Sequence, residues 1–410
     1  MPPGRLKKAA AFLGLRKSIV GLLAMVVLVG MGEKMAERFL PVYLLALGAA
    51  VEAAGILNAL DNFLSALYSF PGGYLSDRLG YKRALLLFNL LAMLGYAIVI
   101  AVPSWWAVFL GSFFFLSWTA ISLPATMSLV ADVLPKNKRT MGVSMHSLVR
   151  RLPMALGPVV GGIFVDLWGR AAGVRIAFCV ALALGAVSMA IQQAMIEEKA
   201  AAGRDVESNP LRLIAAMPRS LRELLVSDIL IRFCEQIPYA YLAIWCMDIH
   251  GTSGFRFGVL TAIEMATAVL VYIPVAYLAD RGGKKPFVVM TFVFFTAFPV
   301  TLAFARTFPL MVAAFIVRGL KEFGEPTRKA LIMDLAPEGQ KAAVFGAYYL
   351  ARDVVVSFGA LAGAFLWKIS PEVNLFVAAA CGLAGTLWFA AFGRDAEPAV
   401  MPSSAPGGGS

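Results

Sequence analysis

Residues 71–83 read Pro-Gly-Gly-Tyr-Leu-Ser-Asp-Arg-Leu-Gly-Tyr-Lys-Arg, and residues 274–285 read Pro-Val-Ala-Tyr-Leu-Ala-Asp-Arg-Gly-Gly-Lys-Lys. Both stretches follow a long apolar run, and both end on an aspartate followed by basic residues. Further matches recur 202 positions apart, and they pair Pro124 with Pro326, Asp132 with Asp334, Pro135 with Pro337, Arg150 with Arg352, Gly157 with Gly359 and Gly161 with Gly363. Chance does not give that many matches at one spacing, so the sequence predicts an internal duplication.

The composition is far more apolar than that of a soluble domain. Hydrophobic residues make up 60% and charged residues 15% of the 410 positions, against about 45–50% and about 25% in soluble proteins. Such a surface can be exposed only to lipid, which predicts an all-α polytopic membrane protein and excludes an ordinary soluble enzyme. The net charge of +11 gathers in short loops without interleaved aromatic residues, so we expect no nucleic-acid partner.

Twelve apolar runs are long enough to cross about 30 Å of hydrocarbon as helices. They occupy residues 18–47, 54–75, 84–102, 105–131, 141–165, 176–195, 224–247, 257–278, 287–305, 309–333, 342–367 and 373–392. We expect an N-terminal six-helix bundle over residues 18–195 and a C-terminal six-helix bundle over residues 224–392, joined by a cytoplasmic loop at 196–223. Residues 1–17 are the expected cytoplasmic N-terminal segment, and the Pro-, Ser- and Gly-rich residues 393–410 are an expected disordered cytoplasmic tail.

The basic residues outside the spans are distributed unequally. The N-terminal segment, the central loop and the loops that follow even-numbered spans hold most of them, and the opposite loops hold only Arg170, Arg175, Arg256, Arg306 and Lys368. The positive-inside rule then predicts that both termini and the central loop are cytoplasmic, as in a bacterial inner-membrane protein.

The first quoted stretch fits the pattern Gly-x-x-x-Asp-Arg-x-Gly-x-Lys/Arg-Arg. Together with twelve spans, the duplication and the central loop, it resembles the major facilitator superfamily. The resemblance implies two bundles that rock around a substrate site at the middle of the membrane. It implies a gating role for the loop residues and their equivalents, namely Gly73, Asp77, Arg78, Gly80, Arg83, Asp132, Arg139, Asp280, Arg281 and Asp334. It further implies that Asp77 contacts residues 341–342 at the start of span eleven, and that Asp280 contacts residues 139–140 by symmetry.

Residues 157–162 read Gly-Pro-Val-Val-Gly-Gly and resemble part of the antiporter signature of drug-efflux members of that superfamily. The match is partial, because Ser144 and Pro153 stand where the signature has glycines. Two interpretations stay open: an efflux protein, or small residues that let helices pack closely.

Charged residues inside the spans are costly in lipid, so we expect them to face a polar interior. The substrate-binding candidates are Glu37, Arg38, Trp118, Arg150, Arg232, Glu235, Arg318, Glu322 and Arg352. In a continuous span ten, Arg318, Glu322 and Glu325 would share one face. For each charged residue, the alternative is a salt bridge that only holds helices together.

Two symmetric pairs stand out among these residues. Arg150 and Arg352 lie near the middle of spans five and eleven, where they are suited to clamp an anion, and Arg38 with Arg232 forms a looser second pair. Asp61 and Glu264 are also equivalent, and a desolvated carboxylate can take up a proton from one side and release it to the other. The proton-coupling candidates are Glu37, Asp61, Glu264 and Glu325.

The sequence favours a monomeric secondary transporter that exports a small organic molecule in exchange for protons. The alternative is a proton-coupled transporter of an organic or inorganic anion held by paired arginines. A Gly-x-x-x-x-Gly-Lys-Ser/Thr loop for ATP is absent from the sequence. With two histidines and no Cys/His cluster, we expect neither enzymatic activity nor a metal or cofactor.

Overall fold

The computed structural model describes residues 17–116, 149–197, 210–215, 217–282, 284–336 and 341–394, and the single positions 118, 122, 126, 129 and 146. All regular secondary structure in these residues is helical. The helices of the first half are α2 (Lys17–Glu37), α3 (Leu40–Ala46), α4 (Glu52–Leu79), α5 (Tyr81–Ala101), α6 (Trp105–Phe115) and α9 (Arg151–Met195). They are followed by α10 (Pro210–Ala215), α11 (Arg219–Tyr239), α12 (Leu242–Ile244), η2 (Trp245–Ile249), α13 (Gly254–Gly282), α14 (Lys285–Phe304), α15 (Phe308–Leu320), α16 (Glu325–Leu335), α17 (Lys341–Ile369) and α18 (Pro371–Phe392). Seven of the helices in the described residues are long and apolar enough to cross a membrane.

Three of the predicted apolar runs are broken helices. The run at 18–47 is split between α2 and α3, and the run at 224–247 is split between α11 and α12. A third break separates α15 from α16 inside the run at 309–333. A proline lies within a few residues of each break. Because its ring lacks the backbone N–H donor and clashes with the preceding turn, it favours the end of a helix there. The fifth and sixth spans are two helices within α9, separated at Gly169, whose backbone is not helical and whose φ is +79°.

The element bounds extend the duplication to the first span of each half. Helix α2 ends at Glu37 and helix α11 ends at Tyr239, 202 positions later. The breaks that follow them keep the same spacing. This register pairs Arg232 with Gly30, so the expected pairing of Arg38 with Arg232 is wrong.

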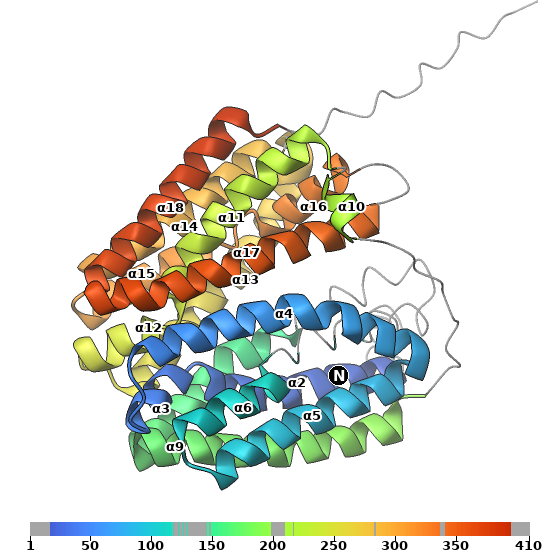
Figure 1. Ribbon diagram of the computed structural model, residues 1–410, viewed down its shortest axis with the longest axis vertical. Helices are drawn as coiled ribbons and strands as arrows, with labels where there is room; N and C mark the ends of the chain where they lie inside the picture. Colours follow the sequence, from blue (N-terminus) through green and yellow to red (C-terminus); the bar gives the residue numbers. More distant parts are fainter. Residues whose placement is uncertain are drawn as a thin grey trace, which may run out of the picture.

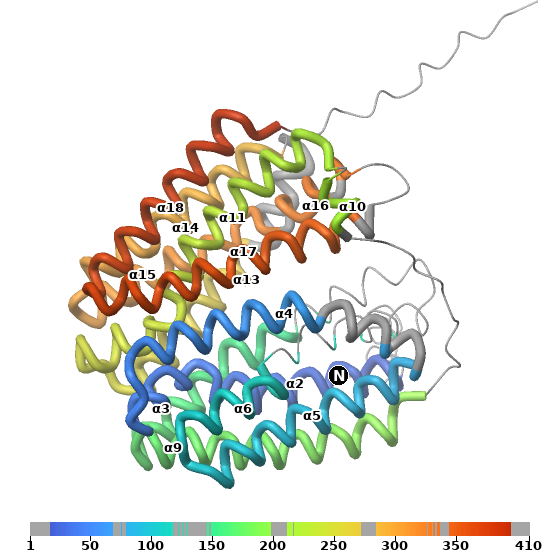
Figure 2. The backbone as a smooth tube through the Cα atoms, viewed as in Figure 1, coloured from blue at the N-terminus to red at the C-terminus, as the bar shows by residue number. Residues whose placement is uncertain are grey.

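The helices form two bundles, one from α2 to α9 and one from α11 to α18 (Figure 1). The bundles lie close together at the end that carries α3 and α12, here called the joined end. They diverge toward the end that carries α10 and α16, here called the divergent end (Figure 2). One cluster of buried apolar side chains runs from the first bundle into the joined end of the second, whereas the divergent end of the second bundle has a cluster of its own.

Equivalent residues fasten the joined end from both sides. Asp166 of α9 accepts hydrogen bonds from the backbone N–H groups of Gly254 (2.7 Å) and Phe255 (2.8 Å), at the start of α13. Lys368 of α17 binds Glu52 at the start of α4, with 2.9 Å between Nζ and Oε1, and this hydrogen bond lowers the pKa of the Glu52 carboxyl. Asp166 and Lys368 are 202 positions apart, and so are Glu52 and Gly254. The two halves therefore make these contacts at equivalent positions.

The glycines of residues 157–162 allow a close approach of backbones. A Cβ atom added to Gly157 would lie 2.7 Å from Cβ of Lys34 in α2, and one added to Gly254 would lie 2.9 Å from the carbonyl oxygen of Gly162. Both distances are shorter than van der Waals contact, so larger residues would push α9 away from α2 and α13. The structure of this segment therefore agrees with the interpretation that its small residues let helices pack closely.

Candidate functional site

The last turn of α2 carries a charge cluster at the seam between the bundles. Lys34 binds both Glu33, at 3.0 Å, and Glu37. Tyr239 of α11 donates a hydrogen bond to Oε1 of Glu37 at 3.4 Å, and the Arg38 guanidinium lies 4.9 Å from the centre of the Tyr239 ring. The predicted neighbouring charges of span one are thus largely engaged with one another and with a tyrosine of the second bundle.

A small cavity, of about 20 Å³, lies inside the first bundle, beside Arg150. Trp118, His146, Glu33 and Lys34 also line it. Trp118 donates its indole N–H to Asn89 at 2.9 Å, so this predicted substrate-binding residue is oriented by the scaffold. Among the residues that the structure describes, no carboxylate binds Arg150.

A second small cavity, of about 40 Å³, lies at the seam toward the joined end. Asp61 of α4 lines it together with Glu37, Asn58 and Tyr239. In the described part of the chain, Asp61 has neither an ion pair nor a hydrogen bond through its side chain. An ionised carboxylate without a counter-ion is unfavourable in such surroundings.

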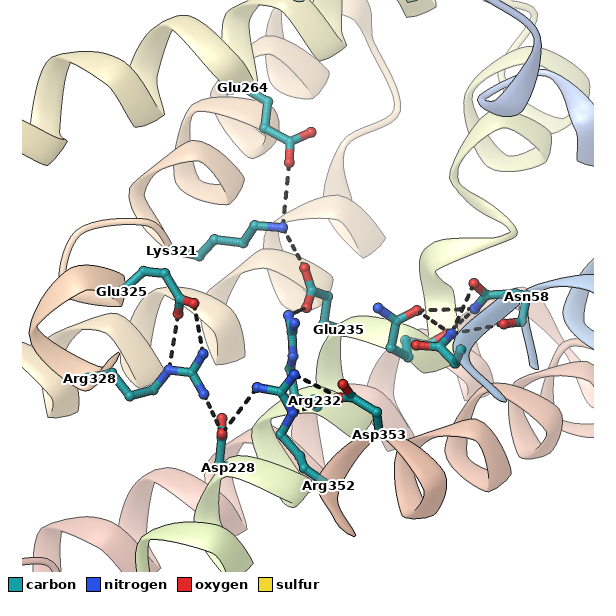
Figure 3. A network of polar contacts seen from close by, with 12 residues as sticks. Asn58, Asp228, Arg232, Glu235, Glu264, Lys321, Glu325, Arg328, Arg352 and Asp353 are labelled. Carbon is teal, nitrogen blue, oxygen red and sulfur yellow. Dashed lines mark hydrogen bonds and ion pairs between the residues drawn. The ribbon is translucent and has the colours of Figure 1, made fainter. Parts of the chain in front are cut away.

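The interior of the second bundle is a network of ion pairs (Figure 3). Glu264 of α13 binds Arg318 at 3.1 Å and Lys321 at 3.5 Å. Lys321 also binds Glu235 of α11 at 2.6 Å, and Glu235 binds Arg232 on the same helix. Glu264 therefore differs from Asp61, its counterpart at the spacing of 203 positions that the loop motif shares, because it has two cationic partners.

A second group of contacts in this bundle centres on Asp228 of α11, where two arginines meet (Figure 3). Arg352 of α17 approaches at 3.4 Å, Tyr348 donates a hydrogen bond at 3.1 Å, and Arg328 of α16 forms an ion pair. Arg352 also binds Asp353 at 2.7 Å. Arg352 thus has two carboxylate partners, Asp228 and Asp353.

Span ten does not present one charged face, because α15 ends at Leu320 and α16 begins at Glu325. Glu322 lies in the break and binds Arg151 of the first bundle at 3.2 Å. Glu325 instead binds Arg328 at 2.8 Å. The expectation of a shared face for Arg318, Glu322 and Glu325 is wrong, and the proline-associated break is its physical reason.

The structure describes only part of the predicted gating set. Gly80 separates α4 from α5 with a φ of +81°, a conformation that favours glycine. Arg83 is exposed in the first turn of α5, and Asp334 of α16 binds Lys284. The residues whose backbone is helical but whose side chains lie outside the described part are Gly73, Asp77, Arg78, Asp280 and Arg281. Asp132 and Arg139 lie entirely outside it, and so do the expected contacts of Asp77 and Asp280.

Several residues of the site were not singled out from the sequence. Arg328 lies in the predicted run at 309–333 but was not a candidate, although it is 2% exposed and pairs with Asp228 and Glu325. A signal existed, because Glu325 and Arg328 are three positions apart on one helix. Asn58 donates hydrogen bonds to the backbone and side-chain oxygens of Gln236, at 3.1 and 3.3 Å, and joins the bundles without charge. No sequence pattern marked this amide pair.

The fold and the buried charges at the seam define a polytopic transporter of two duplicated bundles. The chain matches the Major Facilitator Superfamily twice, over residues 22–233 and 224–409. It therefore belongs to this superfamily, as the loop signature predicted.

Individual relatives agree with this assignment. The chain is 30% identical to YfkF of Bacillus subtilis, an MFS-type transporter, over 37% of this chain and 38% of that protein. It is 22% identical to the multidrug resistance protein MdtG of Escherichia fergusonii over 91% of this chain and 94% of MdtG. The crystal structure of the nucleoside transporter NupG superposes with a TM-score of 0.78, at 13% identity, over 92% of this chain and all of that one. The likeness to NupG bears on the fold alone.

Proposed function

We propose that this protein is a proton-coupled antiporter that exports a small organic molecule by alternating access. Membership of the superfamily supports transport, and the likeness to a multidrug resistance protein along most of the chain supports efflux. The proposal places the protein in a bacterial inner membrane with both termini in the cytoplasm, as a monomer. The divergent end then faces the cytoplasm, and the joined end faces outward.

The observation that carries proton coupling is the isolation of Asp61. Three of the four candidate carboxylates have basic partners: Glu37 has Lys34, Glu264 has Arg318 and Lys321, and Glu325 has Arg328. Asp61 has none among the described residues and lines a cavity at the seam. A proton neutralises such a carboxylate without breaking an ion pair, so its occupancy can follow the side to which the seam is open.

The gating set completes the proposal. The loop residues that follow spans two and eight would close the divergent end when the joined end opens. Opening the joined end would require release of the Asp166 hydrogen bonds and of the Lys368–Glu52 ion pair. Each is a single exposed or half-buried interaction of modest strength, so the joint can be broken during a transport cycle.

The test is transport into everted membrane vesicles from a host that expresses the protein, with the fluorescent lipophilic cation Hoechst 33342 and the anion 1-naphthoate as probes. Respiration acidifies these vesicles, and the proposal predicts probe accumulation that collapses when a protonophore is added. Vesicles without the protein provide the background. Accumulation that persists after the protonophore, or that matches the background for both probes, would contradict the proposed function.

A further inference from the structure

The register of the duplication relates the Asp228 cluster to the cavity in the first bundle. At a spacing of 202 positions, Arg352 corresponds to Arg150, Tyr348 to His146 and Arg328 to Thr126. Asp228 itself corresponds to Val26 of α2. All four of these first-half residues line the cavity of about 20 Å³ in the first bundle.

The cavity therefore lies where the second bundle holds a carboxylate. In the second bundle the Asp228 carboxylate accepts contacts from two arginines and a tyrosine. In the first bundle the arginine remains, the tyrosine is replaced by a histidine, and the carboxylate is replaced by the apolar side chain of Val26. Arg151 stands in place of Asp353, so the second carboxylate partner of Arg352 has no counterpart either.

The remaining carboxylate of the cavity does not replace the missing one. Glu33 lines the same space, but its Oε1 is held by Lys34 at 3.0 Å. Arg150 is thus a cation beside a cavity, without a bound carboxylate in the described residues. An arginine inside a membrane protein is costly unless a counter-charge is supplied, and its planar donor set fits a carboxylate with two parallel hydrogen bonds.

From this geometry we infer that a carboxylate of the transported molecule binds Arg150, in the place that Asp228 occupies in the second bundle. The inference rests on the proposed function and names its substrate class, a small organic acid. His146 and the Thr126 hydroxyl supply further hydrogen-bonding groups, as Tyr348 and Arg328 do around Asp228. Val26, Pro153, Met154 and Trp118 complete the lining of the cavity.

The first test measures binding of acids against their uncharged amides. Acetate, benzoate and 1-naphthoate are compared with acetamide, benzamide and 1-naphthamide at millimolar concentration, by thermal shift of the full-length protein in detergent. At least one acid is expected to raise the melting temperature while its amide does not. In the variant Arg150→Gln, the Kd of that acid is expected to rise about tenfold or more, as for loss of a charged hydrogen-bond partner. Equal shifts by acid and amide, or no shift by any acid, would overturn the inference.

The second test needs no ligand and supplies the missing carboxylate from the chain. Val26→Asp is compared with the uncharged control Val26→Asn, each with Arg150 intact and with Arg150→Gln. With Arg150 intact, the aspartate variant is expected to melt at a higher temperature than the asparagine variant and to bind no acid. With Arg150→Gln, the order is expected to reverse, because an unpaired carboxylate is then buried. The same order in both backgrounds would overturn the inference.

The two proposals fail separately. Acid binding in detergent involves no proton gradient, so it can persist in a protein whose transport ignores the protonophore, and that result would refute only the coupling. A proton-coupled protein that exports Hoechst 33342 but binds acid and amide equally would refute only the carboxylate site. The alternative is a purely structural role for Arg150, in which Glu33 leaves Lys34 and binds Arg150 instead. This alternative predicts no shift of the melting temperature that is specific to acids.

Discussion

Proton-driven transport is expected to fall to the background of protein-free vesicles when Asp61 is replaced by asparagine. Asparagine keeps the size and polarity of the side chain but cannot gain or lose a proton, so the bundles can still rock around bound solute while no proton is carried. Exchange of the same probe across vesicles at equal pH on both sides is therefore expected to survive. The measurement compares accumulation driven by a pH gradient with this equal-pH exchange in Asp61→Asn.

The matched control is Glu372→Gln, a neutralised carboxylate that is exposed in the first turn of α18. It is expected to keep both activities. If Asp61→Asn still responds to the pH gradient as the unmodified protein does, Asp61 is not the coupling residue. If Asp61→Asn loses the equal-pH exchange as well, Asp61 is needed for the conformational change. Its lack of a counter-ion then does not indicate proton coupling.

Replacing Asp228 with valine, the residue of the equivalent position in the first bundle, is expected to lower the free energy of unfolding by about 3–5 kcal/mol. The change leaves Arg328 and Arg352, each 2% exposed, without the carboxylate on which both converge. The lost attraction is not replaced by water at this depth. Unfolding by denaturant in detergent, followed by circular dichroism, measures the loss.

The control for this prediction is an ion pair on the same helix whose arginine faces solvent. Arg219 binds Glu223 at 2.9 Å, but its side chain is 79% exposed. Arg219→Ala is therefore expected to cost less than about 1 kcal/mol. Similar losses in Asp228→Val and Arg219→Ala would mean that the interior of the second bundle is hydrated and that its ion-pair network contributes little to stability.

The fold could be predicted because its signals are repeated and local. The loop signature and the twelve runs each depend on residues close together in the sequence, and the duplication repeats such local patterns at one spacing. The three helix breaks were missed, although a proline marks each of them, because an apolar run does not reveal whether its backbone stays helical.

The sequence predicted which charged residues belong to the site. It did not predict that the two bundles would give these residues different partners. Asp61 and Glu264 are equivalent in sequence, yet only Glu264 has cationic partners, Arg318 and Lys321. The spacing of the duplication places the apolar pair Phe115 and Leu116 where the second half has Arg318, and Leu116 lines the cavity beside Asp61. This difference is visible in the sequence once the register is known. That α4 lies against α6 and at the seam between the bundles could be learned only from the tertiary structure.

Alternating access itself is tested most directly by distances between equivalent positions of the two bundles. Spin labels on Leu167→Cys and Ile369→Cys report on the joined end, and labels on Lys17→Cys and Arg219→Cys report on the divergent end, all in a background without the four native cysteines. Each label replaces an exposed side chain.

Double electron–electron resonance is recorded for both pairs in acidic and in mildly alkaline buffer, with and without Asp61→Asn. The account predicts that the pH change lengthens one pair while it shortens the other, and that Asp61→Asn removes this response. Distances that change together at both ends, or that respond to pH equally in Asp61→Asn, would contradict a transporter that rocks around a proton-binding aspartate.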